Sequence, residues 1–131
     1  LIRYEQGDIV VRGSSCSCGL TLPVLSKIQG RVDDMFHLPT GAASFANINE
    51  TMIQKRLQAE AVQFAQVAMD HVIVRYVAPV EADGDTRKLL IGHIRELLNY
   101  PAMQISFARL PEIPVNDSGK HQRIRREFDL Q

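Results

Sequence analysis

Apolar and polar residues alternate in the middle of the chain, over residues 62–68 and again over residues 71–78. In the second segment, Val72, Val74 and Tyr76 fall on one alternating face. A period of two is typical of a half-buried strand, because successive side chains of a strand point to opposite faces of the sheet. Only a Met-Asp pair separates the segments, a spacing typical of a hairpin turn. These residues therefore predict two antiparallel strands.

Two further segments show the longer period of an amphipathic helix. The first covers about residues 49–60, where Asn47 or Asn49 could cap the first turn through its side-chain oxygen. The second covers residues 87–99, follows a polar loop whose Asp and Thr residues can cap it, and ends before Pro101. We therefore predict two main helices. The apolar stripe of the second helix consists of Leu89, Leu90, Ile94, Leu97 and Leu98.

The remaining apolar segments are shorter. Apolar and polar residues alternate over residues 104–110, which predicts a third strand, and residues 123–128 suit a short final helix. With the segments above, they predict an α+β core in which a three-stranded antiparallel sheet carries the two main helices on one face. Near the start, residues 9–11 and 24–28 are short apolar runs around a turn rich in Gly, Ser and Cys, a pattern that predicts a β-hairpin.

The composition changes this picture little. The chain has 131 residues, of which 45% are hydrophobic and 23% charged, which suits one ordinary core with a small appendage. Its 15 basic and 15 acidic side chains cancel, so no overall field favours nucleic acid or an anionic membrane. No apolar run approaches the roughly 20 residues that span a bilayer, and the first residues lack the layout of a secretion signal. A cytoplasmic protein is the expectation.

Three short polar motifs interrupt the apolar pattern. Residues 3–8 read RYEQGD, residues 30–34 read GRVDD, and residues 114–123 read PVNDSGKHQR. In this order, with the length of one small domain between the second and the third, they resemble the motifs of the carboxyl-terminal part of adenylate-forming acyl-CoA ligases. The branch they resemble is that of phenylacetate-CoA ligase and the capsular polysaccharide biosynthesis (coenzyme F390 synthetase-like) proteins. The resemblance covers nearly the whole chain, although each motif is short.

The resemblance implies an ATP-dependent reaction in which a carboxylic acid forms an acyl-adenylate and then a thioester with CoA or a carrier-protein thiol. Lys120 matches the lysine that bridges carboxylate and α-phosphate, a role that suits a compact charge on a flexible stem. Asp8 matches the aspartate that accepts hydrogen bonds from the ribose hydroxyls of AMP. Arg31 matches an arginine that contacts the nucleotide, and Asp33 matches the hinge about which the small domain rotates.

The same resemblance divides the chain into two parts. Residues 1–32 would be a β-ribbon remnant of a large amino-terminal domain, and residues 33–131 would be the mobile lid domain. The large domain would hold most of the ATP or AMP, Mg²⁺ and the carboxylic acid, so the chain alone is expected to be inactive. The chain begins without a methionine, and we expect an excised fragment of a longer ligase. A sheet edge exposed by truncation could pair with a second copy to form a homodimer.

Cys16 and Cys18 stand in the sequence CSCG, where they are too close for an ordinary disulfide. In the family branch named above, a similar stretch supplies two thiolates of a structural zinc site. A closed zinc site takes four ligands, and the sequence offers no further Cys and no suitably spaced His. Zinc bound with ligands from outside this chain and a pair of free, reactive thiols remain as alternatives.

Other interpretations of the same residues stay open. Each motif taken alone is also typical of a solvated turn or a charged loop. A stand-alone α+β ligand-binding or regulatory module would share the predicted fold, and it predicts that the chain binds a specific small molecule by itself. A nucleic-acid-binding protein would use the basic side chains around Lys120, but aromatic residues do not interleave with them.

Overall fold

The alternating apolar residues in the middle of the chain form the two central strands of a sheet, as the sequence predicts. In the computed structural model, which describes residues 7–116 and 119–130, β5 (Ala61–Ala68) and β6 (His71–Val77) pair antiparallel. The apolar side chains on one face of these strands are completely buried, so their removal from water stabilises this side of the sheet. They are Val62, Phe64, Val72, Val74 and Tyr76.

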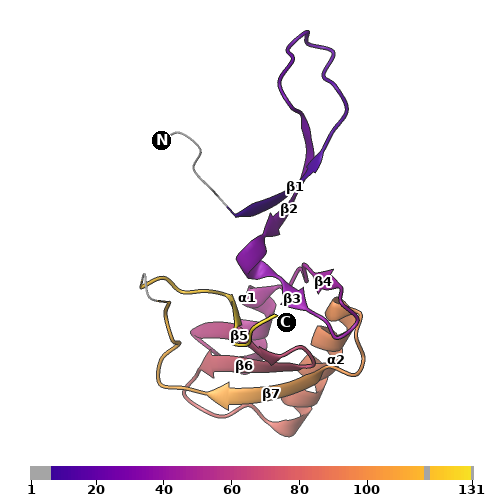
Figure 1. Ribbon diagram of the computed structural model, residues 1–131. Coiled ribbons are helices and arrows are strands. Elements are labelled where there is room, and N and C mark those ends of the chain that lie inside the picture. The colour runs from indigo at the N-terminus through magenta and orange to yellow at the C-terminus, as the bar shows by residue number, and fades with distance from the viewer. Residues whose placement is uncertain (1–6, 117–118, 131) are drawn as a thin grey trace.

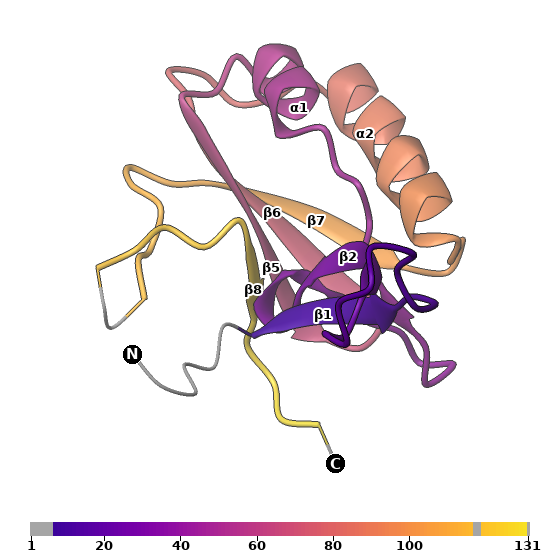
Figure 2. The same cartoon turned by 90° about the horizontal axis from the view of Figure 1, so that it is seen from above.

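Both predicted helices are confirmed, and local chemistry fixes where they begin. α1 (Glu50–Leu57) begins after Asn49, whose side-chain oxygen accepts a backbone N–H of the first turn at 3.0 Å. α2 (Gly84–Leu98) begins earlier than predicted, after Asp83, whose carboxylate accepts a first-turn N–H at 2.7 Å. Figure 2 shows both helices on the same side of the sheet. No helix in the described residues has the length and apolarity needed to cross a membrane. The buried helix residues are Ile53, Leu57, Leu90, Ile94 and Leu98.

The third strand runs in the opposite direction to the predicted one. β7 (Gln104–Arg109) pairs with β6 in parallel, so the predicted three-stranded antiparallel sheet is wrong, although the α+β class is confirmed. The reason is the connection between the strands. α2 carries the chain back along the sheet after β6, and a strand that follows such a crossover runs parallel to the strand before it.

A fourth strand takes the place of the predicted final helix. β8 (Ile124–Arg126) pairs in parallel with β5, which gives the sheet the order β7-β6-β5-β8. Ile124 is 1% exposed and belongs to the same buried core as Phe64, its partner on β5. The predicted helix over residues 123–128 is therefore wrong. Pairing with β5 overrides the local preference of a segment this short.

The predicted hairpin near the start is confirmed as a two-stranded ribbon. β1 (Asp8–Arg12) and β2 (Leu25–Arg31) pair antiparallel, and Figure 1 shows the ribbon projecting from the rest of the molecule. Residues 3–6 of the RYEQGD motif and the serine of the Ser-Gly-Lys turn lie outside the described residues. Most large apolar side chains of the ribbon and its loop are exposed. They include Val10, Val11, Leu20, Leu22, Leu25 and Ile28.

A short segment joins the hairpin to the sheet. It contains the 3-10 helix η1 (Val32–Asp34) and a small ribbon of β3 (Phe36–His37) and β4 (Ala43–Ser44). At the end of the hairpin, Gly30 has φ +152°, and a Cβ at this position would lie 3.2 Å from the Phe45 ring. Glycine therefore allows a close approach between the hairpin and the ring of Phe45, which follows β4. The division into domains between residues 32 and 33 stays a prediction.

Candidate functional site

The β1–β2 ladder brings two of the predicted site residues together. Asp8 begins β1 and Arg31 ends β2, and the antiparallel register places them opposite each other. Arg31 Nε lies 3.8 Å from Asp8 Oδ1, and the two side chains are 63% and 36% exposed. An exposed ion pair of this kind contributes less than about 1 kcal/mol to stability. Both groups can therefore meet a ligand: the carboxylate can accept from hydroxyl groups, and the guanidinium can donate to phosphate oxygens.

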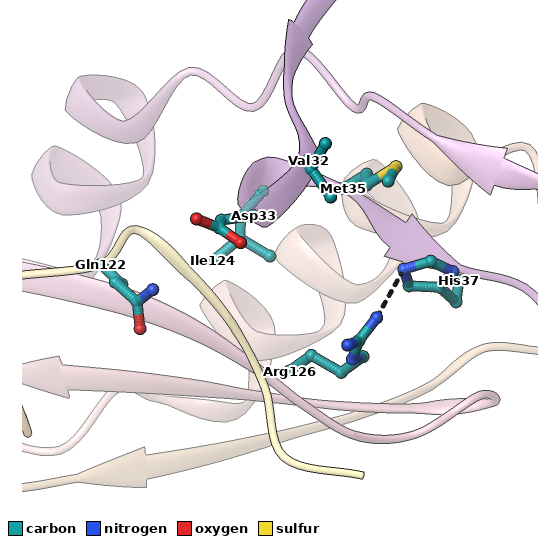
Figure 3. Close-up of a pocket in the computed structure, with 7 residues that line it drawn as sticks. All are labelled: Val32, Asp33, Met35, His37, Gln122, Ile124 and Arg126. Carbon is teal, nitrogen blue, oxygen red and sulfur yellow. Dashed lines mark hydrogen bonds between the residues drawn. The ribbon is translucent and has the colours of Figure 1, made fainter. Parts of the chain in front are cut away.

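Asp33 lines a small pocket where η1 meets β8 (Figure 3). The pocket has a volume of about 150 Å³. Sites for organic ligands usually measure about 300–1,000 Å³, so this pocket suits a few water molecules better than a metabolite. It joins the predicted hinge to the strand that follows Lys120. The other lining residues are Val32, Met35, His37, Gln122, Ile124 and Arg126.

One hydrogen bond crosses this pocket. Arg126 Nη1 donates to His37 Nε2 over 3.1 Å (Figure 3). Because a guanidinium can only donate, the imidazole must present a lone pair on Nε2 and is neutral in this contact. Partial burial, and then the charge of Arg126, lower the pKa of His37 below its ordinary value of 6.5. The contact between β3 and β8 is therefore strongest at neutral and alkaline pH.

Lys120 lies on a hydrogen-bonded turn between β7 and β8. Its backbone N–H donates to Asn116 Oδ1 at 2.8 Å, and the Asn116 N–H donates to the Lys120 carbonyl at 3.0 Å. Gly119 has φ +73°, a conformation that glycine adopts without steric cost, and its N–H donates to the Asn116 carbonyl at 2.8 Å. These bonds fix the backbone of Lys120 while its side chain is exposed. A lysine presented in this way can reach a group outside this chain.

Two buried glutamines of β5, absent from the sequence-based predictions, hold the segments on either side of the sheet. Gln66 Nε2 donates to the His37 carbonyl at 2.6 Å, and Gln66 Oε1 accepts from the His37 N–H at 3.0 Å. Gln63 Nε2 donates to the carbonyls of Pro114 and Gln122 at 3.2 and 3.0 Å. Both side chains are 0% exposed. A glutamine inside an otherwise apolar strand is the signal that could have identified them, because a buried amide needs partners.

A charged pair supports Gln63 on the sheet face opposite the helices. Arg75 on β6 donates two hydrogen bonds of 2.8 Å to the Glu127 carboxylate, and Arg75 Nη1 also donates to Gln63 Oε1 at 3.3 Å. Arg125 Nε lies 3.1 Å from the same carboxylate. The hydrogen bonds from Arg75, followed by the charges of both arginines, lower the pKa of Glu127.

Cys16 and Cys18 lie in the exposed loop of the hairpin as free thiols. Hydrogen bonds with the Cys16 side chain and then with the backbone of Leu20 lower the pKa of Cys18. Over residues 7–116 and 119–130, no three His, Cys, Asp or Glu side chains are grouped so that they could hold a metal ion. Two thiols alone do not complete a closed zinc site, so zinc binding stays a prediction.

The predicted site residues do not converge on one pocket. Asp8 and Arg31 meet on the hairpin, and Asp33 lies in the segment that follows it. The residues that line the pocket beside Asp33 do not include Asp8, Arg31 or Lys120. Lys120 is connected to this pocket only through the following segment, which contributes Gln122 to its wall. The predicted site residues are therefore distributed over the hairpin, the segment that follows it and the Lys120 turn.

Comparisons with known proteins give a weak likeness. No protein-family profile matches the sequence, and no curated protein matches it. Two solved structures of a 2-hydroxyisobutyryl-CoA ligase are similar: an open conformation in complex with 2-HIB-AMP and CoA, with a TM-score of 0.42, and the postadenylation state in complex with 2-HIB-AMP, with a TM-score of 0.43. Each is 20% identical over 90% of this chain, which spans 27% of the ligase chain. At this identity and these TM-scores, the likeness leaves the family of the chain open.

Proposed function

We propose that this chain is the hinge and lid portion of an ATP-dependent acid–thiol ligase. A carboxylate attacks the α-phosphate of ATP and pyrophosphate leaves; a thiol, that of CoA or of a carrier protein, then attacks the acyl carbon and AMP leaves. The observation that best supports this proposal is the Lys120 turn. Hydrogen bonds with Asn116 fix its backbone, and the ammonium group is exposed where another domain could receive it.

Lys120 acts in the first half-reaction. As the carboxylate attacks, negative charge gathers on its oxygens and on the α-phosphate together, and a cation placed between them stabilises this transition state. An ammonium group suits the position because it is a compact charge on a flexible stem. A guanidinium would instead bind one of the two groups through its planar fork.

The hairpin supplies nucleotide contacts and the junction supplies the hinge. The Asp8 carboxylate accepts from the ribose hydroxyls, and Arg31, which lies opposite it, contacts the nucleotide. Asp33 is the hinge residue between them and the lid. The described residues contain no cluster for Mg²⁺, and we assign this ion and the acid pocket to a large partner domain. Mg²⁺ bound there would neutralise phosphate charge.

The stand-alone binding module is the second interpretation, and the cavities do not favour it. The pocket of about 150 Å³ beside Asp33 is smaller than most metabolite sites. A larger groove of about 520 Å³ is lined only by Asn49 and residues of α1, so it is an open surface along one helix. The first cavity lies between several elements but is too small for most metabolites, and the second lies on a single helix.

Carboxylate-dependent ATP–pyrophosphate exchange tests the proposed function. We expect exchange by the ligase formed from this chain and its large domain, with some member of a panel of aryl and fatty acids, and no exchange by the chain alone. Lys120→Ala should lower exchange about 10²–10³-fold while nucleotide still binds, and Lys120→Arg should not restore it. Lys55→Ala, which removes another exposed lysine, is the matched control and should change nothing.

Two outcomes would contradict the proposal. One is exchange that Lys120→Ala leaves unchanged, and the other is the absence of exchange for every acid in the panel. Specific binding of a small molecule by the chain alone would instead favour the stand-alone module. When exchange is found, adding CoA or a thiol-bearing carrier protein identifies the acceptor of the second half-reaction.

A further inference from the structure

One buried side chain anchors the segment that carries Lys120 on both sides. Gln63 lies in the middle of β5 and is 0% exposed. Its Nε2 donates to the carbonyl of Pro114, before the turn, at 3.2 Å and to that of Gln122, after the turn, at 3.0 Å. A primary amide has two N–H donors. Both donors of Gln63 are therefore bound to the segment that contains Lys120.

The orientation of this amide is determined by its partners. Gln63 Oε1 accepts from Arg75, which the Glu127 carboxylate holds through two hydrogen bonds of 2.8 Å. A guanidinium can only donate and a backbone carbonyl can only accept. A reversed amide would place donor against donor and acceptor against acceptor, so a single orientation satisfies every contact.

Hydrogen bonds also close the turn between the two points at which Gln63 holds the segment. Between Pro114 and Gln122, the turn is closed by its own hydrogen bonds between Asn116 and Lys120. A large shift of the Lys120 backbone relative to the sheet would therefore lengthen or break the bonds from Gln63. Breaking them leaves a buried amide without partners, which is strongly unfavourable.

We infer that Gln63 is a positioning residue for Lys120. This inference rests on the proposed function and extends it to a residue that lies outside all three motifs. A displacement of about 1 Å at a reacting group can lower a rate about 10²-fold, so the location of the turn on the sheet matters as much as the lysine itself. Gln63 meets no substrate, and it acts by fixing the point from which the lysine is delivered.

Gln66 provides a matched control on the same strand. It is equally buried, and its amide is also saturated with hydrogen bonds, to the backbone of His37 and the carbonyl of Met69. The spacing of three residues places Gln63 and Gln66 on opposite faces of β5. Gln66→Leu should therefore destabilise the protein about as much as Gln63→Leu without releasing the Lys120 turn.

Cleavage of the 131-residue chain by trypsin measures how readily the Lys120 turn opens. It cleaves after Lys120, and cleavage requires that the turn open. We expect Gln63→Leu to accelerate this cut about tenfold relative to the cut after Lys27 in the exposed hairpin, as the loss of two hydrogen bonds predicts. Gln66→Leu should leave the ratio at the wild-type value. Gln63→Glu keeps the size of the side chain and an acceptor for Arg75 but lacks both N–H donors, so it should open the turn even where Gln63→Leu does not fold.

The two half-reactions of the assembled ligase measure the effect on chemistry. Gln63→Glu and Gln63→Leu should lower kcat for adenylation about 10- to 100-fold, with KM for ATP within about twofold of wild type. Thioester formation from added acyl-adenylate should be unchanged, because Lys120 acts only in the first step. A purely structural defect would lower the rates of both half-reactions together. Gln66→Leu should therefore leave the ratio of the two rates unchanged.

The outcomes separate this inference from the proposed function. Suppose that adenylation depends on Lys120, but both Gln63 variants leave unchanged either the ratio of the two tryptic cuts or the ratio of the two half-reactions. This result overturns the positioning role of Gln63 and leaves the proposed function standing. Absence of adenylation in the wild type overturns the proposed function, and the positioning role is overturned with it. A faster cut after Lys120 together with a selective loss of adenylation supports both.

Discussion

The β1–β2 hairpin and the β5–β6 pair are built from similar residues, yet they differ in what surrounds them. Both pairs are antiparallel and rich in valine and isoleucine. In β6, Val72 and Val74 are 0% exposed, whereas in the hairpin Val10 is 43% and Ile28 66% exposed. A strand pattern therefore predicts local structure but not the surface that covers it. A two-stranded ribbon is only marginally stable alone in water. Because its apolar side chains are exposed, they are available for packing against another surface.

The strongest test of this difference removes a buried ring from the sheet. Phe64→Ala should lower the free energy of unfolding by about 3–5 kcal/mol, because the change takes a 0% exposed ring out of the core and leaves a cavity behind. Urea unfolding followed by circular dichroism measures the loss. A loss below about 1 kcal/mol would mean that the core can collapse around the smaller side chain and is not closely packed.

A smaller effect is expected from the polar face of the same sheet. Arg75→Ala should lower the free energy of unfolding by about 2 kcal/mol at neutral pH, since Glu127 and Gln63 lose a charged donor. The pKa of Glu127 is lowered from its ordinary 4.5, so the pair stabilises the fold above that pH, and its contribution is lost as the pH falls through the lowered value.

The pH dependence separates this pair from general damage. Unfolding experiments at several pH values should show wild type and Arg75→Ala converging in strongly acidic solution. Arg125→Ala, which removes the more exposed partner of Glu127, is the control and should have a weaker effect of the same direction. A constant difference between wild type and Arg75→Ala at every pH would show that the ion pair is not the cause.

The smallest effect is expected on the hairpin. Ile28→Ser should change the free energy of unfolding by no more than about 0.5 kcal/mol, because the side chain is 66% exposed. Thermal unfolding at several protein concentrations measures the change. A loss above about 1 kcal/mol that grows with protein concentration would show that a second copy covers the hairpin.

Local patterns were sufficient for the helices and central strands, and insufficient for the ends of the sheet. The caps at Asn49 and Asp83 and the alternation around Val74 can be recognised within a few residues of sequence. The direction of β7 depends on the crossover of α2, and β8 is three residues long, with Arg125 and Arg126 resembling an exposed basic segment. Only pairing with β5 makes this segment a strand.

In the candidate site too, local patterns predict some features, and contacts between distant segments determine the others. The contact between Asp8 and Arg31 follows from the hairpin register, whereas the sequence predicts the two strands but not how they are paired. The hydrogen bonds of Gln63 to Pro114 and Gln122 join positions far apart in sequence, and no local period indicates them. The roles of Lys120 and Asp33 stay predictions, because they concern a nucleotide and a second domain that belong to the proposed function.

The position of β8 at the edge of the sheet next to β5 implies an order of folding. Gln63 and Gln122 are separated by 59 residues, so the anchor of the Lys120 turn forms only after a long loop has closed. The β5–β6 hairpin, by contrast, closes through a two-residue turn, and we expect it to form early with the helices. Lys120 is therefore set in place last, and the same segment should be the first part of the four-stranded sheet to detach when the protein begins to unfold.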